Sequence, residues 1–169
     1  MSFLISLSIV FTRIFSIRIP LFGVEGIRIG FGALPTIFAG IIFGPLAGGI
    51  VGGISDLIGY FINPMGAYMP HFTLTAFLTG FIPGLIFHYI FKAKVNYWVL
   101  FISIGIGQII TSIILVPLFI HILFGAPYLP ILIPRIIGEP IHVTIFAYLI
   151  KALTNYNFIK VPENSKLIN

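Results

Sequence analysis

The feature that most constrains this chain is a series of long apolar tracts with little sequence between them. Of its 169 residues, 59% are hydrophobic and only 8% are charged, against roughly 25% charged in ordinary soluble domains. A helix needs about 20 apolar residues to span the hydrocarbon core of a bilayer. The tracts lie at about 3–17, 29–43, 46–62, 72–91, 97–120 and 129–150.

These tracts predict an all-α membrane protein, a single six-helix transmembrane bundle whose second and third helices are short. Strands of a transmembrane barrel would alternate apolar and polar residues over about ten positions, and these tracts do not alternate. We expect one integral membrane domain over residues 1–169, because the connections are too short to form another domain. The first tract lacks a basic leader and a small-residue cleavage site, so we expect it to be a retained helix.

The distribution of lysines predicts the orientation of the bundle. Lys92 and Lys94 lie between the fourth and fifth tracts, and Lys151, Lys160 and Lys166 follow the sixth. With six helices, these positions share one side of the membrane. The positive-inside rule then places both termini in the cytoplasm of a multi-pass plasma-membrane protein.

A ladder of glycines at four-residue spacing runs through the second and third tracts, at Gly40, Gly44, Gly48 and Gly52. Glycines at this spacing allow close approach of helix backbones. We therefore expect the helices at 29–43 and 46–62 to pack tightly through a turn at Gly44. A nucleotide-binding loop is excluded, because no Lys-Ser/Thr pair follows the glycines.

Asp56 lies inside the third apolar tract, where a lipid-facing carboxylate would cost about 3 kcal/mol. It therefore faces protein, water or a ligand. Tyr60 and Asn63 follow at i+4 and i+7, which places all three on one helix face. An irregular segment containing Met65 and Tyr68 comes next and is followed by Phe72 at the start of another tract. This arrangement predicts a pocket open on the outer side of the membrane.

A second set of polar residues occupies the sixth tract, where Arg135, Glu139 and His142 share one helix face at i, i+4 and i+7. The cost of exposing such groups to lipid predicts that they turn inward toward Asp56. The alternative for Arg135 and Glu139 is mutual neutralisation as an ion pair. The turn-rich segment 18–26 is predicted to be an extracellular loop or a re-entrant segment. Arg28 follows it and either anchors at the headgroups or meets a ligand.

Small and hydroxyl-bearing residues also recur in the apolar tracts. Ser8, Thr12 and Ser16 form a four-spaced row on the first helix, which either admits a partner helix or packs inside the bundle. The polar residues of the fourth and fifth tracts are weaker ligand candidates, because neighbouring helices can satisfy them. These residues are His71, Thr73, Thr75, Thr79, Gln108, Thr111 and Ser112.

No Walker sequence, zinc-protease motif, nucleophile elbow or paired-carboxylate signature is present. The chain therefore cannot hydrolyse a nucleotide, and uphill transport would need a partner or a coupled ion. A stand-alone secondary transporter would be expected to show an internal repeat, and no second copy of the glycine ladder is seen. A small intramembrane enzyme would need a catalytic constellation. A binding protein set in the bilayer is the favoured class.

Several motifs together resemble the substrate-binding S components of energy-coupling factor (ECF) vitamin transporters, most closely the folate-specific group. They are GVEGIRIG (23–30), FAGIIFGPLAGGIVG (38–52), DLIGYFINPMGAYMP (56–70) with the following FTLTA, and PRIIGEP (134–140). The resemblance implies a six-helix bundle that binds its vitamin tightly near the extracellular side. It also implies docking onto a membrane coupling protein with two cytoplasmic ATPases, and no enzymatic activity. S components for riboflavin or thiamine are the alternative within this group.

The resemblance also suggests roles for particular residues. Arg28 matches the arginine of the family's first loop, and Arg135 lies in its sixth-helix binding region. Ser8, Thr12 and Ser16 stand where the family docks onto the coupling protein, although that row is usually alanine-rich. For a folate, Asp56 would pair with the pterin, and Arg28 or Arg135 would meet the glutamate tail. The aromatic or methionine wall would come from Tyr60, Met65, Tyr68 and Phe72.

Overall fold

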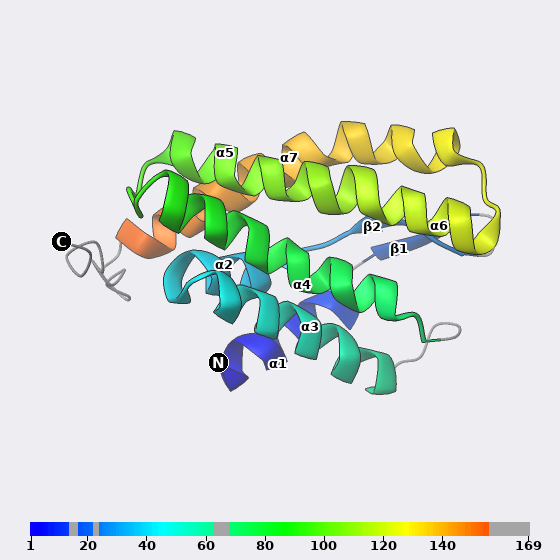
Figure 1. The fold of residues 1–169 in the computed structure, drawn as a ribbon, viewed down its shortest axis with the longest axis horizontal. Helices are drawn as coiled ribbons and strands as arrows, with labels where there is room; N and C mark the ends of the chain where they lie inside the picture. Colours follow the sequence, from blue (N-terminus) through cyan, green and yellow to red (C-terminus); the bar gives the residue numbers. More distant parts are fainter. Residues whose placement is uncertain (14–16, 22–23, 63–67, 156–169) are drawn as a thin grey trace.

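The computed structural model describes residues 1–13, 17–21, 24–62 and 68–155, with the backbone alone described for 17–21 and 24–29. Its helices form one bundle (Figure 1). Their bounds are α1 Ser2–Arg13, α2 Ala33–Phe43, α3 Pro45–Ile62, α4 Pro70–Leu85 with the π-helical η1 Ile86–Ile90, α5 Tyr97–Gln108, the π-helical η2 Ile109–Leu115, α6 Val116–Phe124 and α7 Tyr128–Asn155.

These elements make six helical rods, because η1 extends α4, and α5, η2 and α6 run on as one helix over 97–124. Four rods are long and apolar enough to cross a membrane, with 18, 21, 28 and 28 residues. The other two, α1 and α2, have only 12 and 11 residues. The prediction of an all-α six-helix membrane bundle is therefore confirmed. The prediction that the second and third helices are short is right for α2 and wrong for α3, which has 18 residues, and the other short rod is α1.

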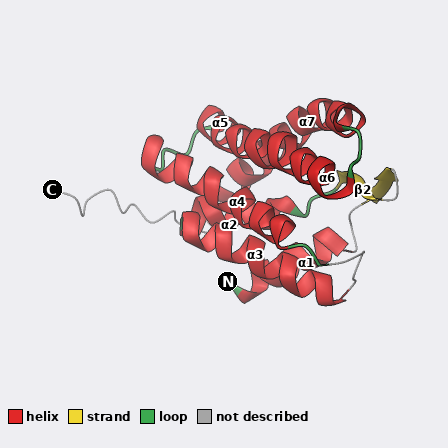
Figure 2. Ribbon diagram, turned by 45° about the vertical axis from the view of Figure 1, so that its right-hand side comes forward, coloured by secondary structure: helices red, strands yellow, loops and turns green. Residues whose placement is uncertain are grey.

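The segment predicted as a loop after the first helix contains a small antiparallel hairpin. Its strands are β1 Ile17–Leu21 and β2 Val24–Ile29, and their register pairs Arg18 with Arg28 and is irregular between Ile19 and Pro20. The hairpin lies at one end of the bundle, and β2 contacts α7 (Figure 2, yellow). The second apolar tract, expected as helix from residue 29, therefore becomes helical only at Ala33.

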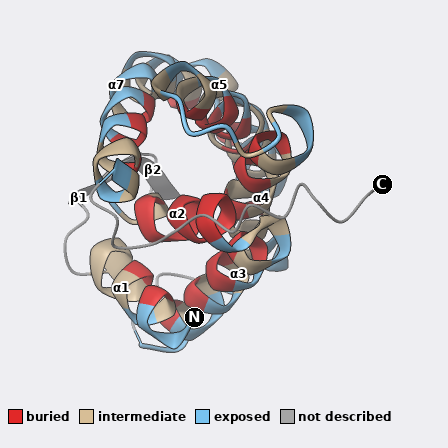
Figure 3. Ribbon diagram, turned by 90° about the vertical axis from the view of Figure 1, so that its left-hand side faces the viewer, coloured by how far each residue is buried: buried red, intermediate tan, exposed pale blue. Residues whose placement is uncertain are grey.

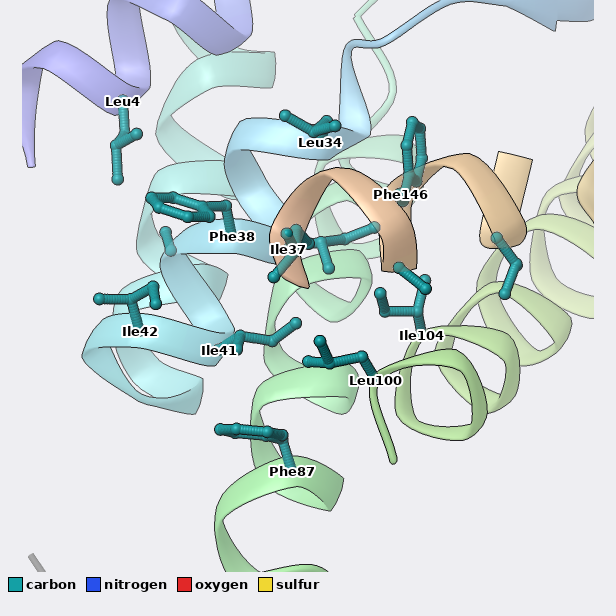
Figure 4. Close-up of a cluster of buried hydrophobic side chains, with 14 of the residues drawn as sticks. Leu4, Leu34, Ile37, Phe38, Ile41, Ile42, Phe87, Leu100, Ile104 and Phe146 are labelled. Carbon is teal, nitrogen blue, oxygen red and sulfur yellow. The ribbon is translucent and has the colours of Figure 1, made fainter. Parts of the chain in front are cut away.

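Helix α2 is short because protein encloses it. Every residue from Leu34 to Ile42 is buried, and α2 lies in the middle of the ring formed by the longer helices (Figure 3). Its side chains meet Phe87 of η1, Leu100 and Ile104 of α5 and Phe146 of α7 in the main apolar core (Figure 4). A helix surrounded by protein in this way does not need to be long enough to span the hydrocarbon core of the bilayer.

The glycine ladder brings three helices together. A Cβ atom built on Gly48 of α3 would lie 2.6 Å from the Cα atom of Gly40 in α2 and 2.6 Å from the carbonyl oxygen of Gly80 in α4. Gly44, with φ +98°, forms the turn that joins α2 to α3. The predicted close packing of α2 on α3 is confirmed, and α4 joins the same contact through Gly80 and Gly84.

The lysines that the structure describes gather at one end of the bundle. The turn between η1 and α5, which holds Lys92 and Lys94, lies at the same end as the last turn of α7 (Figure 1, left). The ammonium group of Lys151 in α7 is 6.0 Å from the centre of the Tyr97 ring in α5. The predicted clustering of these three lysines on one side is therefore confirmed. Lys160 and Lys166 lie outside the described residues.

Candidate ligand-binding cavity

A cavity of about 460 Å³ lies inside the bundle, lined by residues of all six rods. Gly30 and Gly32, which join the hairpin to α2, also line it. Ser8 and Thr12 of α1 and Thr36 of α2 contribute hydroxyl groups. Space of this size is typical of a site for a small organic molecule.

Asp56 lines the cavity from α3, as the sequence predicted for a carboxylate that avoids lipid. Its Oδ2 atom accepts a hydrogen bond of 2.8 Å from the hydroxyl group of Thr73. The hydroxyl groups of Thr73 and Tyr68 are 3.0 Å apart. Because Thr73 gives its hydrogen to the carboxylate, Tyr68 is the donor to Thr73. A chain of two hydrogen bonds therefore fixes the orientation of Asp56.

Arg135 and Glu139 line the cavity from α7, one helical turn apart, and both contact Ser112 of η2. The hydroxyl group of Ser112 donates to Oε1 of Glu139. Nη1 of Arg135 lies 3.2 Å from the Ser112 hydroxyl oxygen and 3.4 Å from its carbonyl oxygen. We name these three residues the α7 cluster. It places a cationic donor beside an anionic acceptor on one cavity wall.

Threonines in the cavity wall present oxygen atoms as acceptors. Thr75 and Thr79 of α4 each donate a hydrogen bond of 2.8 Å to the carbonyl oxygen four residues earlier, and Thr111 of η2 does the same at 2.9 Å. A hydroxyl group whose hydrogen is engaged in this way can only accept a further bond. This part of the cavity therefore favours ligand groups that donate hydrogen bonds.

His142 and Phe146 extend the α7 wall of the cavity, and their rings stack at 5.9 Å between centroids and 11° between planes. Phe72 of α4 and Val116 of α6 add apolar surface. The cavity therefore combines charged groups with flat apolar surfaces on which a ring system could lie.

Half of the predicted ligand-binding set lines the cavity. Asp56, Phe72, Arg135, Glu139 and His142 are brought together there.

The other predicted residues lie elsewhere or are not described. Tyr60 and Tyr68 pack against each other at 5.2 Å between ring centroids, beside the cavity and not in its wall. Asn63 and Met65 lie outside the described residues, and only the backbone of Arg28 is described.

The predicted docking row does not face outward in the described part of α1. Ser8 is only 3% exposed, and its hydroxyl group is 3.2 Å from that of Thr36. Thr12 lines the cavity, and Ser16 lies outside the described residues. These positions favour the alternative of packing inside the bundle. The docking role of the row stays a prediction.

Ser112 and Thr73 are the residues that sequence reasoning underrated. Both were predicted only as weak ligand candidates, yet the hydroxyl group of each donates a hydrogen bond to a carboxylate of the cavity. The signal was their hydroxyl group inside an apolar tract, which many packing roles share. Among the residues that the structure describes, no three His, Asp or Glu side chains are grouped closely enough to hold a metal ion.

A family model, a curated protein and a solved structure each match this chain. The model of the family described as ECF-type riboflavin transporter, S component, matches residues 1–156. The folate transporter FolT of Clostridium novyi (strain NT) is 39% identical over 169 residues, covering 100% of this chain and 91% of that protein. The crystal structure of FolT bound with folic acid matches with a TM-score of 0.75 and 28% identity, covering 98% of this chain and 92% of that one.

Proposed function

The chain belongs to the S components of ECF-type transporters, and from this we propose that it captures a folate in its central cavity for an ATP-driven coupling module. The relative that is 39% identical is a folate transporter, and the similar crystal structure holds folic acid. Both cover nearly the whole chain. The resemblance noted in the sequence supports the same ligand.

One observation carries this proposal, namely that two carboxylates and an arginine line a single cavity. A pterin presents an amino group and a ring N–H, which a carboxylate accepts, and a carbonyl oxygen, which an arginine meets as a donor. The glutamate tail is anionic and calls for a further cation. Arg28, on the hairpin beside α7, is our candidate for the tail.

Riboflavin is the second candidate, because the matching family model is described by that vitamin. Its ring would also lie against Phe72, Phe146 and His142. Its pyrimidine edge, however, presents one N–H group between two carbonyl oxygens, so it offers a carboxylate one donor where a pterin offers two adjacent donors. The carboxylates of the cavity therefore favour folate.

Calorimetry on the purified protein in detergent, without ATP, tests the proposal against folate, riboflavin, thiamine and biotin. We expect tight binding of folate, because the chain contains a complete cavity. Binding of riboflavin and not of folate would overturn the folate assignment while leaving the family intact. A heat-denatured sample is the control for nonspecific uptake into detergent.

We further propose that the chain acts as one membrane domain without its own ATPase, with both termini in the cytoplasm. The lysines at one end of the bundle support this orientation through the positive-inside rule. Because the sequence has no cysteine, Ser2→Cys introduces a single thiol. An impermeant maleimide should label it only after the cells are opened. Labelling of intact cells would reverse the orientation.

A further inference from the structure

The carboxylate of Glu139 has one oxygen atom without a hydrogen bond. Oε1 accepts from the Ser112 hydroxyl, whereas Oε2 is buried and has no hydrogen-bond partner among the described residues. An unpaired buried polar atom is costly, and more so when it is charged. Because Glu139 lines the cavity, a rotation of its side chain can bring this oxygen to a donor group of the ligand, which supplies the missing bond.

Arg135 stands next to this acceptor. Its Nη1 atom reaches the same Ser112 hydroxyl group that donates to Glu139, so the α7 cluster holds its donor and its acceptor side by side. Such a pair suits a ligand edge with an acceptor next to donors. Because the charges of Arg135 and Glu139 nearly cancel, the pair recognises a ligand by the geometry of its hydrogen bonds and not by net charge.

The pyrimidine edge of a pterin has this pattern, with the O4 carbonyl, the N3–H group and the 2-amino group in a row. Arg135 can donate to O4 while the Glu139 carboxylate accepts from N3–H and the 2-amino group. A flavin carries a carbonyl oxygen where the pterin has its 2-amino group. That oxygen would face the carboxylate and repel it.

We propose that the α7 cluster forms hydrogen bonds with the pyrimidine edge of the pterin. Glu139 is the residue that selects a ring with a 2-amino group over a ring with a 2-oxo group. This inference rests on the proposed folate function and adds where the pterin ring lies in the cavity and which of its edges faces α7. It differs from the sequence-based interpretation, which assigned the pterin to Asp56. In both carboxylates one oxygen accepts from a hydroxyl group. Of the two, Glu139 is the one that has a buried oxygen without a partner and an arginine on the same hydroxyl group.

A matched pair of small ligands tests this proposal. 6-Hydroxymethylpterin and 6-hydroxymethyllumazine lack the glutamate tail and differ at position 2, where the first has an amino group and the second an oxo group. Each is titrated as a competitor of radiolabelled folic acid on wild-type protein, Glu139→Gln and Asp56→Asn. Elution as a single species in size exclusion and an unchanged Tm confirm that each variant is folded.

We expect the wild-type protein to prefer the pterin by at least about thirtyfold, and Glu139→Gln to reduce this preference to about threefold or less, because an amide can donate to the 2-oxo group. Asp56→Asn should leave the preference unchanged. An unchanged preference in Glu139→Gln, or its loss in Asp56→Asn alone, overturns the inference but not the folate function. Failure of the wild-type protein to bind folic acid overturns both.

If Glu139→Gln does not fold, Ser112→Ala serves as the second variant. It keeps both charges and removes the hydroxyl group that holds Oε1 of Glu139. We expect it to lower the preference for the pterin about threefold or more, because the carboxylate loses its fixed orientation. A full wild-type preference in Ser112→Ala would overturn the inference.

Discussion

The contact between α2, α3 and α4 and the cavity beside it show two opposite uses of the same helices. In the contact, Gly40, Gly48 and Gly80 leave no room for even one added carbon atom. One turn beyond Gly52, the same helix α3 presents Asp56 to a cavity of about 460 Å³. At the glycine contact, the absence of side chains lets the backbones of the helices approach one another. At the cavity, polar side chains surround open space.

This difference separates stability from ligand recognition. Backbone-to-backbone contact cannot relax when atoms are added, so changes there act on the fold. Polar groups that face a cavity can be exchanged for others of similar shape, so changes there act on binding.

Gly48→Ala should have the largest effect. The added Cβ atom would lie 2.6 Å from both the Gly40 Cα atom and the Gly80 carbonyl oxygen, and we expect a loss of about 3 kcal/mol in stability. Thermal unfolding in detergent measures it. The matched control is Gly53→Ala on the same helix, whose Cβ atom would lie 3.8 Å from Phe77. Equal Tm values for the two variants would contradict the close contact.

Ser8→Leu should destabilise the bundle by about 2 kcal/mol and weaken folate binding, because the larger side chain must fit beside Thr36 at the cavity wall. Ser6→Leu is the control, because Ser6 is exposed on the outer face of α1. Tm and folate affinity are measured for both. If Ser8→Leu keeps both and instead loses co-purification with the coupling protein, the docking role predicted for Ser8 is right.

Arg28→Ala should weaken folate binding about tenfold, roughly 1.4 kcal/mol, through loss of a cation for the glutamate tail. Its strand position opposite Arg18 makes Arg18→Ala a useful second variant. Competition by 6-hydroxymethylpterin, which has no tail, should be nearly unchanged. A similar loss of affinity for folate and for the tail-less pterin would show that Arg28 does not bind the glutamate tail.

Thr73→Val should have the smallest effect, about a threefold to fivefold loss of folate affinity, or roughly 0.7–1 kcal/mol. The substitution removes the hydroxyl group that orients Asp56 and keeps the shape of the side chain. Thr73→Ser restores the donor and should bind as the wild type does. Should Thr73→Ser bind as weakly as Thr73→Val, the methyl group of Thr73 is what matters.

The sequence predicts the structure where the signal is local. The length of an apolar tract predicts a membrane helix, and the spacing of Gly40, Gly48 and Gly52 predicts close approach, because both depend on residues within a few turns of one another. The inward position of Asp56, Arg135 and Glu139 follows equally from the cost of placing a charge in lipid. The hairpin at 17–29 was missed because Pro20, Gly23 and Gly26 are typical of loops as well.

The membrane class, the six helices and the inward charges were thus determined by the sequence alone, through hydrophobicity and short-range spacing. Only the tertiary structure decided that Ser8 turns toward Thr36, that Thr73 holds Asp56 and that Ser112 joins Arg135 to Glu139. Each of these contacts joins two helices or two distant turns. Such contacts depend on how each helix is rotated about its axis, and that rotation is set by the packing of the whole bundle.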